Sequence, residues 1–340
     1  MIIRSKAPLR LGLAGGGSDV SPYSDIYGGA ILNATINMYA YATIEPTDNG
    51  KIAFEFPAKG YCEEFSASDF IEPAGDFLLQ KGIYNRVVKD FCGGKPLSFR
   101  LSTFIDAPPG SGLGTSSTLV VAILGAFAEW LKLPLGEYDI AQLAYKIERE
   151  DLAMAGGKQD QYAATFGGFN FMEFAGDKVI VNPLRIRSKY ADELSHNLVL
   201  YSTGTSRLSA EIIAKQQKNV LAKNAQSIES MHKIKEQAVM MKEVLLRGEI
   251  DKIGEILEFG WQHKRKMAEG ISNEIIDKIY AAAMAAGATG GKVSGAGGGG
   301  FMFFYCPDVS RFRVIDALEK FGGQAKRYEF VNEGLKSWTM

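Results

Sequence analysis

The chain has 340 residues, of which 46% are hydrophobic and 23% charged, with a formal net charge of −1, and these values describe a globular protein of one large or two ordinary domains. The near-zero charge argues against nucleic acid or an anionic membrane as a partner, and three cysteines far apart in the sequence form neither a disulfide framework nor a metal-binding spacing. Because the N-terminus lacks the layout of a signal peptide and the most apolar stretch, residues 118–131, is too short to cross a bilayer, we expect a cytoplasmic protein.

The first half of the chain mixes predicted strands with predicted helices. Runs rich in β-forming residues between turn signals predict strands at 2–7, 9–14, 29–45, 51–56 and 97–104. Residues 167–182 are typical of a β-hairpin with Gly176-Asp177 at its turn. Apolar residues at helical spacing predict helices at 77–91, 115–131 and 137–153.

The second half begins near Asn182-Pro183. Residues 208–247 contain neither Gly nor Pro, and apolar residues recur there every three or four positions, which predicts an amphipathic helix. The remaining predicted elements are strands at 196–202, 301–305 and 324–330 and helices at 249–267, 273–286 and 308–321. Because strands and helices follow one another without strict βαβ alternation, we expect an α+β architecture with two lobes, 1–182 and 183–340, that meet at a cleft.

The most informative segment is the glycine-rich turn at 106–118, which leads into an apolar helical run. Backbone N–H groups at a helix N-terminus lack intrahelical partners and attract anions, and glycines let the backbone approach a phosphate closely. Ser116 and Ser117 fall in the first helical turn, where a cap or a metal ligand would lie. The segment therefore predicts a triphosphate cradle, although its spacing is neither Walker A nor Gly-x-Gly-x-x-Gly, and a tight turn with a Ser or Thr cap is the structural alternative.

A second candidate is Gly156-Gly157-Lys158-Gln159-Asp160-Gln161-Tyr162, a glycine turn before a predicted helix. Asp160 could orient or deprotonate a substrate hydroxyl, and Lys158 could neutralise phosphate charge. The alternative is that Asp160 is only a favourable charge at a helix N-terminus. Glu148, Glu150 and Asp151 precede this turn, and one of them paired with Ser116 would suit Mg²⁺, whereas a solvated acidic face is the preferred interpretation for Glu150 and Asp151.

The N-terminal segment from Arg10 to Asp19 ends a strand in three glycines and a Ser-Asp pair. Arg10 offers a permanent planar cation, and Asp19 could accept hydrogen bonds from sugar hydroxyls, unless Ser18 or Asp19 only caps a helix. A final glycine run at 292–300 has a high ordering cost, which close backbone approach would justify. A flexible surface loop fits poorly there because an aromatic strand follows directly.

Together these segments resemble the three signature motifs of the galactokinase, homoserine kinase, mevalonate kinase and phosphomevalonate kinase superfamily, in the expected order and through essentially the whole chain. The resemblance implies a two-lobed small-molecule kinase fold, with a ribosomal-protein-S5-like N-terminal lobe, an α/β C-terminal lobe and the active site in the cleft. It also implies ATP and Mg²⁺ as cofactors. The phosphate-binding loop that it implies consists of Pro109, Gly110, Ser111, Gly112, Leu113, Gly114, Thr115, Ser116 and Ser117.

The same resemblance assigns roles to other residues. Ser116 and Glu148 match the magnesium-binding pair, Asp160 matches the catalytic aspartate, and Arg10 matches the basic residue beside it. Lys158 is expected to help stabilise developing charge. The residues expected to bind the substrate are Arg10, Gly17, Ser18, Asp19, Asp160, Arg207 and Gly297.

Within the superfamily the likeness is strongest to bacterial D-glycero-D-manno-heptose 7-phosphate kinases, through residues 7–19, 106–114, 156–162 and 203–207 and the pair Trp261 and Lys264. Gly16 and Gly17 stand where galactokinases carry Glu-His, which argues against a galactokinase and is compatible with a larger or already phosphorylated sugar. This implies transfer from ATP to the anomeric hydroxyl of a heptose 7-phosphate, giving the 1,7-bisphosphate, as in nucleotide-activated heptose biosynthesis for surface polysaccharide. Arg207, Lys158 and Lys264 are the candidates for binding the 7-phosphate.

Two alternatives remain open from the sequence. One is an anomeric kinase for another sugar, such as fucose or galactose. The other is a non-catalytic sugar or nucleotide sensor on the same fold, which the presence of Asp160, Glu148 and Ser116 disfavours. The expected partners are a small-molecule sugar phosphate and ATP, with the chain acting as a monomer or homodimer.

Overall fold

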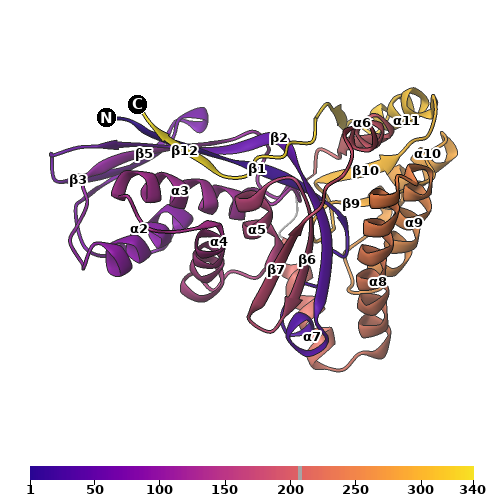
Figure 1. The fold of residues 1–340 in the computed structure, drawn as a ribbon, viewed down its shortest axis with the longest axis horizontal. Coiled ribbons are helices and arrows are strands. Elements are labelled where there is room, and N and C mark those ends of the chain that lie inside the picture. Colours follow the sequence, from indigo (N-terminus) through magenta and orange to yellow (C-terminus); the bar gives the residue numbers. More distant parts are fainter. Residues whose placement is uncertain (206–208) are drawn as a thin grey trace.

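The computed structural model describes residues 1–205 and 209–340 (Figure 1). Its strands are β1 (Ile3–Ala14), β2 (Gly29–Pro46), β3 (Lys51–Phe56), β4 (Tyr61–Ser66), β5 (Phe99–Ile105), β6 (Phe169–Ala175), β7 (Lys178–Pro183), β8 (Leu198–Ser202), β9 (Gly290–Val293), β10 (Phe301–Tyr305), β11 (Gln324–Lys326) and β12 (Lys336–Thr339). Its α-helices are α1 (Tyr23–Tyr27), α2 (Leu78–Phe91), α3 (Thr115–Leu131), α4 (Glu137–Lys146), α5 (Gln159–Phe166), α6 (Ser188–Asn197), α7 (Ser209–Leu221), α8 (Ala225–Arg247), α9 (Ile253–Lys264), α10 (Glu274–Ala285) and α11 (Ser310–Glu319). A π-helix follows α4 at Ile147–Asp151, and short 3₁₀ turns lie at Pro57–Lys59 and Ile250–Lys252.

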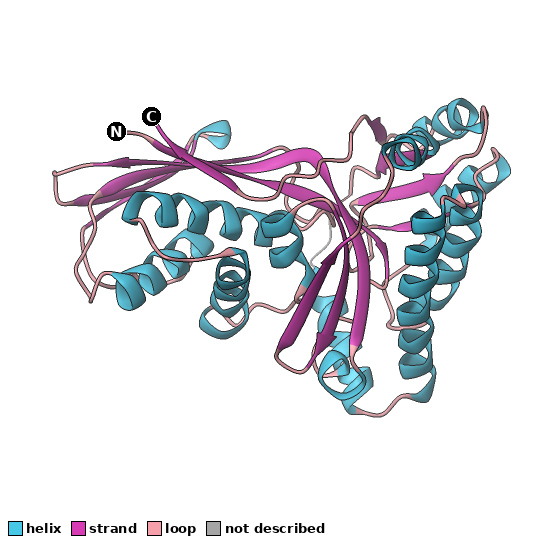
Figure 2. Ribbon diagram, viewed as in Figure 1, coloured by secondary structure: helices cyan, strands magenta, loops and turns pink. Residues whose placement is uncertain are grey.

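The larger sheet has the strand order β12-β1-β2-β5-β3-β4, and the β6–β7 hairpin joins it through β2. Figure 2 shows the helices of this lobe gathered on one face of the sheet. Helix α3 is the central one, and its residues from Ser117 to Phe127 are buried almost without exception because the sheet lies on one side and other helices lie on the other. The predicted strands 2–7 and 9–14 are one strand, β1, whose register shifts between Pro8 and Arg10, where proline has no N–H to donate.

The smaller sheet has the order β11-β8-β10-β9 and packs against α9, α10 and α11 (Figure 1). Helix α8 lies against α9 and against β1 and β2. One hydrophobic cluster continues from this sheet into the larger one, since Leu9 and Leu32 of β1 and β2 share it with Leu200 of β8 and Met241 of α8. The predicted α+β architecture with two lobes is confirmed. The lobes are joined by a common apolar core that holds the facing walls of the site together.

Several boundaries differ from those predicted. The single helix expected over 208–247 is divided, because Asn224 leaves the helical conformation and caps α8 by accepting a hydrogen bond from the Ser227 N–H. Helix α6 precedes the strand expected at 196–202, and β4, β9 and β12 were missed. Short strands carry too few residues for their pattern to be distinguished from a loop.

The last residues of the chain return to the first sheet, where β12 pairs with Ile3–Lys6 of β1 (Figure 1). The division at residues 1–182 and 183–340 stays a prediction, but this tail departs from it and lies with the first lobe. Across the described ranges, no helix combines the length and apolar character needed to cross a membrane.

Candidate active site

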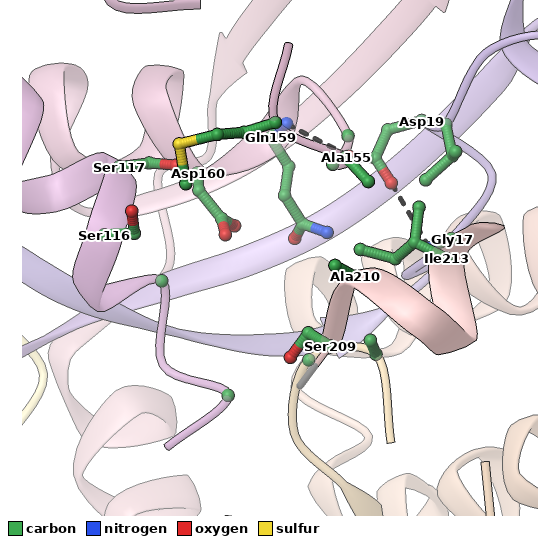
Figure 3. Close-up of a pocket in the computed structure, with 18 of the residues that line it drawn as sticks. Gly17, Asp19, Ser116, Ser117, Ala155, Gln159, Asp160, Ser209, Ala210 and Ile213 are labelled. Atoms are coloured by element: carbon green, nitrogen blue, oxygen red, sulfur yellow. Dashed lines mark hydrogen bonds between the residues drawn. The ribbon is translucent and has the colours of Figure 1, made fainter. Parts of the chain in front are cut away.

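A pocket of about 290 Å³ lies where the two lobes meet, and Figure 3 shows the residues around it. The first lobe contributes the glycine-rich loop, the start of α5, Arg10 of β1 and the turn that follows β1, and the second contributes Lys264 and the Gly295–Ala296 segment. The N-terminal turns of α7 close a further side with Ser209, Ala210 and Ile213. The sequence analysis missed α7 as part of the site because its residues carry no motif.

The glycine-rich loop presents every second residue to the pocket. Gly110, Gly112 and Gly114 line it at φ values of 74°, 79° and 78°, whereas Ser111 and Leu113 are buried behind them. The carbonyl oxygens of these two buried residues accept hydrogen bonds from the backbone N–H groups of Phe301 (2.9 Å) and Arg10 (3.1 Å). The loop is therefore fixed from behind by both lobes, with its glycine backbone facing the cavity.

Helix α3 begins at Thr115, directly after the loop, and among the described residues no side chain caps its N-terminus. The alternative of a Ser or Thr cap is therefore wrong: the N-cap is Gly114. The free N–H groups of the first turn, beside Thr115, Ser116 and Ser117 in the pocket wall, are an anion-binding arrangement. Pro109 is exposed and lies outside the lining, so its expected place at the nucleotide is not supported by the geometry.

Asp160 lies in the first turn of α5, opposite the start of α3 (Figure 3). Its Oδ1 accepts hydrogen bonds from Arg10 Nε (2.8 Å) and forms an ion pair with Arg10 Nη2 (2.7 Å). The third nitrogen of Arg10, Nη1, donates to the Gly112 carbonyl. A Cβ placed on Gly114 would lie 3.3 Å from Asp160 Oδ2, so the missing side chain lets this carboxylate approach the phosphate loop.

Glu148 lies on the π-helix and is 1% exposed, and burial raises the pKa of its carboxyl group. Ser116 Oγ lies 3.4 Å from Glu148 Oε1, and the amide of Gln161 donates to Glu148 Oε2 and to Ser117 Oγ. The π-helical turn widens the backbone where a functional side chain is placed, as such turns often do. Gln161 belongs to the predicted motif, but its role in orienting Glu148 had no signal in the sequence.

Asp19 caps α5 from a distance of 139 residues along the chain. Its Oδ2 accepts hydrogen bonds from the N–H groups of Lys158 (2.9 Å) and Gln159 (3.1 Å), and its Oδ1 from that of Gly17 (3.2 Å). Burial raises the pKa of the Asp19 carboxyl group. Asp19 and Gly17 line the pocket, whereas Ser18 is buried, donating to the carbonyls of Gly15 and Ala30. Ser18 therefore holds the glycine turn in shape and lies outside the pocket lining.

The lysines are arranged differently from the prediction. Lys158 Nζ binds the Asp25 carboxylate (3.2 Å) and the Gly176 carbonyl, and the residue lies outside the pocket lining. This position gives no support to its expected part in charge stabilisation, which stays a prediction. Lys264 lines the pocket, with Nζ bound to the carbonyls of Gly16 (3.1 Å) and Gly295 (2.8 Å), and burial lowers its pKa to about 8.

Of the two remaining predicted substrate residues, Gly297 is not in the lining. Gly297 has a φ of 115° and packs against the backbone of Ile271, so its neighbours Gly295 and Ala296 form the wall instead. Arg207 lies outside the described residues. The close backbone approach expected of the 292–300 run is confirmed, because a Cβ on Gly295 would lie 2.8 Å from the Cα of Gly112.

Within the described part of the chain, no group of three or more His, Cys, Asp or Glu side chains is arranged to hold a metal ion. The Ser116–Glu148 pair offers a hydroxyl and a carboxylate oxygen at the wall of the pocket. Mg²⁺ is often bound by one or two protein oxygens and completes its shell with phosphate and water, so this donor set fits it.

The chain matches the GHMP kinases N terminal domain over residues 79–168 and the GHMP kinases C terminal domain over residues 241–324. It is 51% identical over 340 residues to a D-glycero-alpha-D-manno-heptose 7-phosphate kinase of Campylobacter jejuni, with 99% of each chain covered. A crystal structure of a D-glycero-D-manno-heptose 1-phosphate kinase from Bacteroides thetaiotaomicron superposes with a TM-score of 0.84, at 47% identity and 99% coverage of both chains. The galactokinase of Lactococcus lactis, at 20% identity and with 98% of this chain and 95% of that chain covered, shares the fold with a TM-score of 0.74.

Proposed function

The chain belongs to the GHMP kinase family, and from this premise we propose that it transfers the γ-phosphoryl group of ATP to the anomeric hydroxyl of D-glycero-D-manno-heptose 7-phosphate, giving the 1,7-bisphosphate. The observation that carries the proposal is the 51% identity, over the whole of both chains, to a kinase named for this sugar phosphate. The juxtaposition of Asp160 with the phosphate loop supports it, because a hydroxyl held by this carboxylate would face a phosphoryl group held by the loop.

The backbone N–H groups at the start of α3 would bind the β- and γ-phosphates of ATP. Phosphoryl transfer depends mainly on positioning and electrostatic stabilisation, and a preformed loop fixed from behind supplies both. Arg10 holds Asp160 Oδ1, which leaves Oδ2 to accept the proton of the anomeric hydroxyl as its oxygen attacks the γ-phosphorus. The bond from the γ-phosphorus to the bridging oxygen breaks, and ADP carries away the electron pair.

Ser116 and Glu148 would hold Mg²⁺, which neutralises charge on the transferring phosphate when it is bound. Gln161 fixes the Glu148 carboxylate by donating to Oε2, so that Oε1 faces Ser116. Gln161 would therefore direct the buried Glu148 carboxylate toward the phosphate side of the pocket.

Asp19, Gly17 and Lys264 would face the sugar phosphate. Lys264 is the described candidate for the 7-phosphate, because its buried ammonium group is bound only to carbonyl oxygens in the structure's described portion and an anion would neutralise it. Arg207 stays a prediction for the same phosphate. We expect the reaction in the cytoplasm, where ATP is supplied, and the oligomeric state stays a prediction of monomer or homodimer.

The test is a sugar panel with the purified protein, ATP and Mg²⁺. The panel holds D-glycero-D-manno-heptose 7-phosphate, the unphosphorylated heptose, galactose and fucose, and ADP release and the ³¹P spectrum of the product are measured. We expect the highest kcat/KM for the heptose 7-phosphate and a new anomeric phosphate signal. A preference for galactose or fucose would overturn the substrate, and binding without ADP release would indicate a sensor.

A further inference from the structure

Gln159 carries a buried polar atom that the mechanism does not use. The residue begins α5, next to Asp160, and is 9% exposed. Its side-chain oxygen, Oε1, has no hydrogen-bond partner among the described residues. Because buried polar atoms almost always have a partner and an unsatisfied one costs free energy, this carboxamide is a candidate for binding a ligand.

The position of Gln159 is fixed at its backbone. The Asp19 carboxylate accepts a hydrogen bond from the Gln159 N–H at 3.1 Å, which anchors the start of the helix. The side chain then lines the pocket, and Figure 3 shows its carboxamide and the Asp160 carboxylate pointing into the same space. The two groups therefore approach one ligand from adjacent residues.

The surroundings of the carboxamide are built from glycine. A Cβ on Gly12 would lie 3.6 Å from Gln159 Oε1, and a Cβ on Gly16 would lie 4.0 Å from Nε2 and 3.5 Å from Lys264 Nζ. A larger side chain at Gly16 would occupy the space between this amide and Lys264. The glycines therefore let the Gln159 carboxamide lie close to the backbone of β1 and of the turn that follows it.

Each of three charged groups nearby has a partner within the protein. Asp160 is paired with Arg10, Asp19 binds backbone N–H groups, and Lys264 binds carbonyl oxygens. A neutral carboxamide both donates and accepts hydrogen bonds, and so does a sugar hydroxyl, which makes the two complementary. When the anomeric hydroxyl is held at Asp160, the ring hydroxyl nearest to it is the one on C2.

We propose that Gln159 is a specificity-determining residue that recognises the C2 hydroxyl of the sugar beside the reacting anomeric hydroxyl. The inference rests on the proposed function, because it takes the sugar as substrate and Asp160 as the group that holds its anomeric oxygen. It goes beyond that function because it assigns recognition of the sugar's configuration to a residue that takes no part in the chemical step. Gln159 acts on which sugar is accepted and does not transfer a proton.

The experiment measures kcat/KM for heptose 7-phosphate and for its 2-deoxy and 4-deoxy analogues in the wild type and in Gln159→Met. The wild type is expected to lose about 10- to 100-fold on the 2-deoxy analogue, since the carboxamide is then left unpaired. In Gln159→Met the parent sugar is expected to lose a similar factor and the 2-deoxy analogue to lose no more. The loss of kcat/KM on the 4-deoxy analogue is expected to be equal in both proteins, because Gln159 does not contact the C4 hydroxyl in this proposal.

The matched control is Gln217→Met on α7, where the glutamine amide donates to the Ser21 carbonyl at 3.0 Å, away from the pocket. This variant is expected to keep the full 2-deoxy penalty. If Gln159→Met does not fold, Gln159→Asn withdraws the amide by one methylene and is expected to lose the same discrimination. A 2-deoxy penalty as large in a folded Gln159 variant as in the wild type would overturn the inference.

Failure of the proposed function gives a different result. If the wild type rejects heptose 7-phosphate and phosphorylates another sugar, the substrate assignment is wrong. The 2-deoxy form of the accepted sugar then decides the role of Gln159 by the same comparison.

Discussion

Arg10 holds Asp160 through two of its nitrogens, with Nε at 2.8 Å and Nη2 at 2.7 Å from the same carboxylate oxygen. The pair joins β1 to the first turn of α5 across 150 residues of sequence, and the third guanidinium nitrogen binds the carbonyl of Gly112 in the phosphate loop. One arginine therefore sets the distance between the Asp160 carboxylate and the glycine-rich loop. Oδ2 remains directed to the loop.

Asp160→Asn is expected to lower kcat by about 10² to 10⁴ because the amide cannot accept the hydroxyl proton. The asparagine oxygen can still accept from Arg10, so the fold and the KM for ATP are expected to change little. Steady-state kinetics with heptose 7-phosphate and ATP measure both quantities. A rate near that of the wild type would show that Asp160 does not hold the reacting hydroxyl.

Glu148→Gln is expected to preserve thermal stability at neutral pH while it lowers kcat. Burial raises the pKa of Glu148, so the folded state binds this proton more tightly than the unfolded state and stability falls as pH rises above the ordinary glutamate pKa near 4.5. Glutamine does not titrate, so the variant lacks this fall in stability with rising pH. At neutral pH, without Mg²⁺ and nucleotide, it is expected to unfold at a temperature no lower than the wild type.

Activity should move in the opposite direction, with kcat falling about 10²-fold or more as the buried carboxylate is removed from the phosphate side of the site. Thermal unfolding of both proteins between pH 5 and pH 8 isolates the contribution of Glu148 as a difference. A variant that is less stable at neutral pH yet fully active would contradict the assignment.

The lowered pKa of Lys264 predicts that substrate binding depends on pH. Burial lowers its pKa to about 8, so the free enzyme loses the ammonium charge as pH rises through that value. The kcat/KM for heptose 7-phosphate is expected to fall above pH 8, and Lys264→Met is expected to remove this inflection and raise the KM of the sugar phosphate. The unphosphorylated heptose serves as the control, since its KM would not depend on Lys264 if this lysine binds the 7-phosphate.

Gly112→Ala is expected to destabilise the phosphate loop. Gly112 has a φ of 79°, and a Cβ there would collide with the carbonyl oxygen of Ser294 in the other lobe. The cost is expected to be about 1–3 kcal/mol, together with a higher KM for ATP. Gly50→Ala is the matched control, because Gly50 has a similar φ of 68° but no atom within 4 Å of its Cβ position. Equal losses of stability in the two variants would mean that the contact with Ser294 has no effect.

The local features of the phosphate site followed from the sequence. The order Gly110, Gly112, Gly114 and then an apolar run was enough to predict a loop at the start of α3, because backbone conformation and free helix-end N–H groups depend on residues that are neighbours in the chain. Arg10, Ser116, Glu148 and Asp160 were identified from motifs, and the structure brings all four to one pocket.

Side-chain partners distant in sequence were decided by the tertiary structure alone. Nothing in the pattern distinguished Lys158, which turns away to Asp25, from Lys264, which lines the pocket. Asp19 caps a helix that begins 140 positions later, and the buried Oε1 of Gln159, close to Gly12 of β1, has no hydrogen-bond partner among the described residues. Local rules fix where the backbone turns, whereas tertiary packing within and between the lobes fixes which polar groups meet, and that packing is not encoded in any short stretch of the chain.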